Sequence, residues 1–221
     1  PKYPIKWLDR ISFPTWLYQR DFSDPWKEGN RILFVGQLLH YSTTTLQHYN
    51  TPSFRPSTAS GEIPPVTSTE KNEIPRLRPS GSARDDKYKK MLSQLMDWLD
   101  ETIDPKTGFW GTQAPWNKDT YAGMLGAYHQ YILYKLVRRQ PPYIHAAVTH
   151  TLELQYPDGL FRRYGAGGAC EDLDAATIIV QGYPFVDSKT QQRIQNVLTG
   201  MHEKLARMQH PDGGFAYNPY I

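Results

Sequence analysis

The sequence predicts an all-α protein in which paired helices stand in a ring, and three observations lead to this prediction. Residues 155–161 and 209–215 share Gln, Pro-Asp-Gly and Phe at identical positions, 54 residues apart. Residues 107–110 form a looser copy of the same turn, about one period upstream. Between the copies, apolar residues recur with the spacing of helices. Self-similarity at such a period is typical of one supersecondary unit repeated along the chain.

The N-terminal third of the chain is expected to contribute one long helix. Residues 1–29 alternate tryptophans with prolines, which favours short helical turns. Asn30 is expected to cap a helix that runs to about His48. Residues 51–84 are rich in Pro, Ser and Thr, which predicts a long surface excursion or a disordered insertion. The single expected domain therefore divides into residues 1–50, the insertion at 51–84 and the repeats at 85–221.

Five further helices are expected in the repeat region. Apolar residues three and four apart predict a helix over residues 85–102. The others are expected over residues 119–138, 143–154, 170–183 and 188–208. The second of the five is rich in Ala and Gly, which lets inner helices approach closely. Each repeated unit is thus predicted to contain an outer helix, a turn and an inner helix.

The register of the turns predicts how the units continue. Asp119 lies 11 residues after Gly108, and Cys170 lies 11 residues after Gly159, so each turn precedes a helix start at one offset. The same offset from Gly213 extends past the last residue of the sequence. We therefore expect the ring to be completed by another copy in a homo-oligomer or by a C-terminal continuation in a longer protein.

Composition and charge exclude several classes of partner. The 25 basic and 22 acidic side chains give a net charge of +3 and are spread along the chain, so no nucleic acid is expected to bind. No apolar run reaches the roughly 18 residues of a membrane span. A single cysteine, Cys170, excludes an intrachain disulfide and favours a cytoplasmic location. The aromatic content of 13% suggests an aromatic-lined cavity for an apolar small-molecule substrate.

The repeated Gln-x-x-Asp-Gly-x-Phe pattern resembles the QW-type repeat of the terpenoid cyclase and protein prenyltransferase superfamily, over roughly residues 85–221. The resemblance implies an α/α toroid, a barrel of helical hairpins, that is incomplete in this chain. Physically, Asp-Gly supplies a left-handed residue, the aromatic side chain fills the gap between helix ends, and the Gln amide bonds free helix-terminal groups. The motif residues are therefore expected to be architectural.

The densest set of reactive groups follows a glycine-rich stretch at residues 165–168. It comprises a thiol and three carboxylates at the start of a predicted inner helix: Cys170, Glu171, Asp172 and Asp174. Residues 172–174 are similar to the first half of the Asp-x-Asp-Asp-Thr-Ala motif of class II terpenoid cyclases. The resemblance places Asp174 at the proton donor, although Ala175 and Ala176 replace the next Asp and the Thr.

Helical geometry limits how these acids can cooperate. Residues two apart lie about 200° apart around a helix, so Asp172 and Asp174 cannot both face one cavity, whereas Glu171 and Asp174 can. Alternatively, all three acids only cap the helix and complement the positive end of its dipole.

A carbocation is best stabilised by aromatic faces, because the ring quadrupole attracts positive charge without reacting. His129, in a predicted inner helix, is a candidate base or hydrogen-bond donor, with a packed core histidine as the alternative. The candidates for substrate binding lie near one predicted rim, and each could instead wedge helix ends: Trp110, Trp116, Tyr121, Tyr128, Phe161, Tyr164 and Tyr217.

No metal and no cofactor are expected. The prenyltransferases of the superfamily bind zinc through Asp, Cys and a later His, and here the order of residues 170–172, Cys-Glu-Asp, is reversed. A second, weaker resemblance links residues 25–38 to an N-terminal stretch of linalool dehydratase-isomerase-like proteins. These are α/α barrels that perform cofactor-free acid–base chemistry with Cys among their catalytic groups. That resemblance would give Cys170 and His129 more weight.

Together these patterns predict a cofactor-independent enzyme that performs acid-initiated carbocation chemistry on an isoprenoid substrate, as a cyclase, isomerase or lyase. In this hypothesis Asp174 protonates the substrate, and Glu171 or Asp172 supports that proton. Two alternatives remain open. One is a carbohydrate-processing α/α-barrel enzyme with stacking aromatics and paired acids. The other is a non-catalytic repeat scaffold or accessory protein.

Overall fold

The computed structural model describes residues 12–44, 83–162 and 168–214. Within these ranges the chain is all-α and contains no strand, which confirms the predicted fold class. The elements in chain order are α1 (Phe13–Tyr18), α2 (Pro25–Thr44), α3 (Ala83–Thr102), α4 (Thr120–Val137), α5 (Ile144–Glu153), α6 (Ala169–Gly182), the short 3-10 helix η2 (Tyr183–Phe185) and α7 (Ser188–Arg207). None of the described helices is both long enough and apolar enough to cross a membrane.

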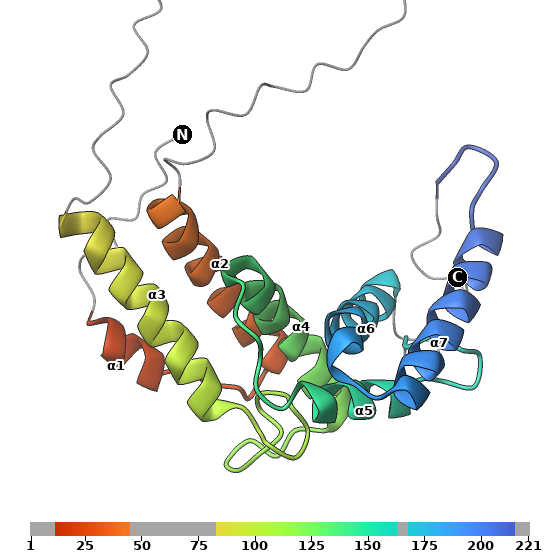
Figure 1. The fold of residues 1–221 in the computed structure, drawn as a ribbon, viewed down its shortest axis with the longest axis horizontal. Coiled ribbons are helices and arrows are strands. Elements are labelled where there is room, and N and C mark those ends of the chain that lie inside the picture. The colour runs from red at the N-terminus through yellow and green to blue at the C-terminus, as the bar shows by residue number, and fades with distance from the viewer. Residues whose placement is uncertain (1–11, 45–82, 163–167, 215–221) are drawn as a thin grey trace, which may run out of the picture.

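The helices follow an open arc (Figure 1). Along its inner side α2, α4 and α6 follow one another, while α3 and α5 lie on its outer side. The most extensive packing joins α2 to α4, and α4 also packs against α6. Of the outer helices, α3 packs on α2 and α5 packs on α6. This alternation agrees with units of one outer and one inner helix, whereas the closed toroid stays a prediction.

The inner helices α2 and α4 approach closely because glycine occupies contact positions on both. A Cβ atom added to Gly29 would lie 2.5 Å from the carbonyl oxygen of Gly126. One added to Gly126 would lie 2.5 Å from the carbonyl oxygen of Pro25. Any side chain at either position would therefore force the two helices apart.

The start of α2 differs from the prediction, and Asn30 is not its cap. Asp24 Oδ1 accepts a hydrogen bond from the Lys27 N–H at 3.0 Å, and Pro25 begins the helix. Proline suits this position because its φ is already helical and its missing N–H would have no partner there. Asn30 lies inside the helix, where its Nδ2 donates to the Trp26 carbonyl at 3.2 Å. The predicted end at His48 and nearly all of the predicted insertion at 51–84 lie outside the described residues.

The five helices of the repeat region begin and end within a few residues of their predicted bounds. Two of them begin at an aspartate cap that satisfies a free amide of the first turn. Asp119 Oδ1 accepts from the Ala122 N–H at 2.6 Å at the start of α4. Asp187 Oδ1 accepts from the Thr190 N–H at 2.7 Å at the start of α7.

The glycines of the three repeated turns share one backbone conformation. Gly108, Gly159 and Gly213 have φ angles of 71°, 82° and 84°, the left-handed region that favours glycine. In the two strong copies the glutamine amide closes the turn itself. Gln155 Nε2 donates to the Gly159 carbonyl at 2.9 Å, and Gln209 Nε2 donates to the Gly213 carbonyl at 3.1 Å. The expectation that this amide bonds helix-terminal groups is therefore wrong.

Candidate functional site

The first turn of α6 is capped by its own acidic residue. The Gly168 N–H donates to Glu171 Oε2 at 2.6 Å. This bond satisfies one of the amides that have no partner within the helix. Glu171 therefore performs the capping role that was the alternative to a catalytic one.

Asp172 joins α6 to the turn that precedes it. Its Oδ1 accepts from the Phe161 N–H at 2.7 Å, and its Oδ2 accepts from Arg162 Nε at 2.8 Å and also from Arg162 Nη2. Both side chains of this ion pair are buried. A buried carboxylate with these partners anchors the helix. Its hydrogen bonds do not connect it to Asp174, so it does not support the proton of that residue. Arg162 was not predicted, because nothing in the sequence distinguishes it from Arg163.

Asp174 is the acid whose surroundings favour its neutral form. Its residue is only 3% exposed, and no described residue donates a hydrogen bond to its carboxylate. Burial, followed by the nearby charge of Glu171, raises the pKa of Asp174 to about 7. A carboxylic acid with this pKa still carries its proton in a large fraction of molecules at neutral pH. Asp172 and Asp174 thus have separate surroundings, in agreement with their spacing on the helix.

Tyr128 of α4 lies beside the acidic turn of α6. Burial raises the pKa of the half-buried Tyr128, and the charges of Asp174 and then Cys170 raise it further. A second contact holds the two helices in this register: nearer the C-terminal end of α6, Gln181 Nε2 donates to the Tyr131 carbonyl at 2.9 Å. Cys170 itself is exposed.

His129, the next residue of α4, faces α2. The His129 ring lies 4.9 Å from the Tyr128 ring and 6.1 Å, edge-on, from the Trp26 ring. Its Nδ1 lies 3.2 Å from the Gly126 carbonyl oxygen. Burial lowers the pKa of His129, which favours the neutral imidazole. Trp26, 52% exposed, was not predicted as a site residue, because the sequence gives no sign that it reaches the second inner helix.

We call Asp174, Glu171, Cys170 and Tyr128 the acid site; His129, next to Tyr128 on α4, borders it on the side of α2. The acid site contains every predicted catalytic residue except Asp172 and His129, and one of the predicted substrate-binding aromatics.

The other predicted aromatics lie elsewhere. Trp110 and Phe161 are buried in the core, and Trp110 Nε1 donates to the Leu99 carbonyl at 3.0 Å. Half-buried Trp116 donates to Asp21 Oδ1 at 3.0 Å and packs edge-on against Phe22. These rings fill the space at helix ends, so they are packed in the protein and are not exposed to a ligand. Tyr164 and Tyr217 lie outside the described residues.

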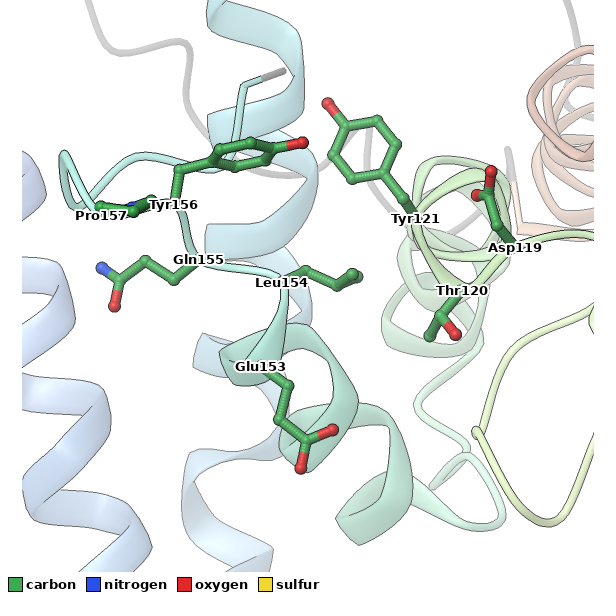
Figure 2. A pocket seen from close by; sticks show the side chains of 8 residues that line it. All are labelled: Asp119, Thr120, Tyr121, Glu153, Leu154, Gln155, Tyr156 and Pro157. Atoms are coloured by element: carbon green, nitrogen blue, oxygen red, sulfur yellow. The ribbon is translucent and has the colours of Figure 1, made fainter. Parts of the chain in front are cut away.

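Tyr121 lines a different cavity, shown in Figure 2. This pocket, of about 540 Å³, lies between the start of α4 and the C-terminal end of α5 with the turn that follows it. We call it the rim pocket. Its lining contains no member of the acid site. The residues that form its other walls were not predicted to line a pocket: Asp119, Thr120, Glu153, Leu154, Gln155, Tyr156 and Pro157.

In the part of the chain that the structure describes, no three His, Cys, Asp or Glu side chains are grouped so that they could hold a metal ion. Comparison of the chain with models of protein families, with curated proteins and with solved structures finds no match.

Proposed function

We propose that the chain forms part of an α/α-toroid enzyme that uses Asp174 to protonate an isoprenoid-like substrate without a cofactor. The observation that carries this proposal is the nearly buried carboxyl of Asp174, whose pKa is raised to about 7 beside Tyr128. The succession of α2, α4 and α6 along one side of the arc, with three turns whose glycines share one backbone conformation, supports the toroid.

An acid that protonates carbon must keep its proton at neutral pH and deliver it in a site from which water is excluded. The positive end of the helix dipole opposes this, since it favours the carboxylate by about 0.3–1 kcal/mol in the first turn. Asp174 lies beyond the first turn of α6, and Glu171 already caps that turn. A pKa raised from 3.8 to about 7 corresponds to roughly 4 kcal/mol in favour of the neutral acid. Burial therefore outweighs the dipole.

An apolar substrate would find suitable surfaces along the inner helices. Leu173 and Val180, on one side of α6, are 55% and 50% exposed, and Trp26 offers an exposed ring on α2. A substrate on these side chains would cover them and displace water from the acid site. In the proposed reaction the Asp174 O–H gives its proton to an alkene carbon, and aromatic faces stabilise the cation. Neutral His129 then removes a proton from the adjacent carbon, which leaves a rearranged alkene.

The test is an assay on linalool, geraniol, farnesol and squalene, followed by gas chromatography with mass spectrometry. We expect a rearranged or dehydrated product with the unmodified chain. Removal of a general acid costs about 10²–10⁴-fold in rate, so Asp174→Asn should lose at least about 100-fold. Asp86→Asn, a matched change at a remote exposed carboxylate, should keep full activity.

Two results would contradict the proposal. Unchanged turnover by Asp174→Asn would exclude this residue as the acid. Absence of product with every substrate, from a chain shown to be folded, would leave the scaffold alternative.

A further inference from the structure

The rim pocket offers a mixture of aromatic, apolar and polar surfaces. Figure 2 shows Tyr156 reaching across toward Tyr121, with Leu154 directed into the space between the α5 and α4 sides. Glu153 contributes a carboxylate from the α5 side. Asp119 and Thr120 line the pocket from the start of α4. Its volume of about 540 Å³ lies within the range of about 300–1,000 Å³ that is usual for pockets that bind small molecules.

We propose that the rim pocket binds a carbohydrate, a ligand class that the proposed reaction of the acid site does not involve. A sugar ring has an apolar C–H face that can pack on Tyr156 and Leu154. Its hydroxyls are donors for carboxylates and both donors and acceptors for tyrosine hydroxyls.

A purely apolar ligand does not suit this lining. It would remove water from the Glu153 carboxylate and from the Tyr156 hydroxyl without offering them new hydrogen bonds. Each polar group buried without a partner costs about 1–3 kcal/mol, and more when it is charged. A polyhydroxylated ligand replaces those water contacts, because its hydroxyl groups form hydrogen bonds with the same side chains.

An organic cation suits it less well than a neutral sugar. Glu153 Oε2 already lies 3.2 Å from His150 Nδ1, and Asp119 Oδ1 already accepts the Ala122 amide at the start of α4. These partners offset part of the negative charge that would attract a cation. A carboxylate has about four lone-pair positions, so Glu153 can still accept sugar hydroxyls.

The rim pocket is separate from the acid site, so the two can be tested independently. Tyr121 and Tyr128 lie seven residues apart on α4, which corresponds to about 10 Å along the helix. Direct binding to the rim pocket therefore does not depend on whether Asp174 is a catalytic acid. Asp174→Asn should leave sugar binding unchanged, even if it abolishes turnover or if no isoprenoid reacts.

The experiment is saturation-transfer NMR together with isothermal titration calorimetry, using cellobiose, maltose and N,N′-diacetylchitobiose as probes. We expect at least one disaccharide to bind with a dissociation constant of about 1 mM or lower, with saturation strongest on the C–H face. Tyr156→Leu should weaken that binding by about tenfold or more, because it removes the ring. Tyr18→Leu is the matched control, since Tyr18 is 85% exposed on α1, outside the rim pocket.

A second variant keeps the test decisive if Tyr156→Leu destabilises the fold. Glu153→Gln changes an exposed side chain and should weaken sugar binding several-fold by removing a charged acceptor. Failure of all three sugars to bind the folded chain would overturn the proposal. Equal affinity in the Tyr156→Leu and Glu153→Gln variants would also overturn it. A third result would overturn it as well: the chain binds choline but binds neither a sugar nor 3,3-dimethylbutan-1-ol, the neutral isostere of choline. That result would assign the pocket to cations.

Discussion

At the scale of single residues, Asp172 and Asp174 differ in what surrounds their carboxyl groups. Asp172 accepts a backbone N–H and two donors of Arg162, all within the protein interior. Asp174 is buried almost as deeply, but no described residue donates to it, and the neighbouring charge is that of Glu171. One acid is therefore suited to holding the fold together, and the other to holding a proton.

The raised pKa of Asp174 has a consequence for stability. The folded chain keeps this proton up to about pH 7, whereas the unfolded chain releases it near pH 3.8. Between these values the folded state binds more protons, so raising the pH favours unfolding. We expect the free energy of unfolding to fall by roughly 4 kcal/mol more in the unmodified chain than in Asp174→Asn between pH 4 and pH 8. Urea titrations across this range measure the difference, and parallel pH profiles for the two proteins would refute it.

At the scale of elements, the contact between α2 and α4 depends on glycine. In most helix interiors alanine is preferred to glycine by about 1 kcal/mol. At Gly29 that preference is reversed, because the added carbon would meet the backbone of Gly126. The backbone cannot rotate away as a side chain can, so the helices themselves must move.

A pair of Gly→Ala variants tests this contact. Gly29→Ala should lower the free energy of unfolding by about 1–3 kcal/mol, the usual cost of overpacking. Gly200→Ala, within α7, should raise it by about 1 kcal/mol, because an added carbon there has no atom within 4 Å. Chemical denaturation of both variants provides the comparison. A gain in stability from both substitutions would mean that the helices separate at no cost.

The sequence predicted most helices of the repeat region because their signals are local. Apolar spacing, the Asp119 cap and the left-handed glycines act within a few residues, and the structure has them where they were expected. The start of α2 was misplaced because Asn30 and Asp24 are both good capping residues, and Pro25 decides between them. The rim pocket and the approach of Trp26 to His129 were not predictable. They depend on how helices pack, which no local pattern encodes.

At the scale of the whole molecule, burial is unevenly distributed along the arc. The central helix α4 is buried along most of its length, with Met124, Ala127, Tyr131 and Leu133 among its fully enclosed residues. By contrast, α7 buries only Ile194, Val197 and Met201. Local stability follows the burial of apolar contacts, so the two helices should open with different free energies.

Hydrogen exchange followed by mass spectrometry can resolve this difference. We expect backbone amides in peptides from α7 to exchange at least about tenfold faster than those from α4 at equal intrinsic rates. Uniform protection of both helices would indicate that the arc unfolds as a single cooperative unit.

The bonds of Asp172 to Phe161 and Arg162 also bear on how this protein can evolve. They tie the start of α6 to the end of the turn before it. Substitution of either Asp172 or Arg162 alone would leave the other charge buried without its partner. The two positions are therefore expected to change together, or not at all, as the protein evolves.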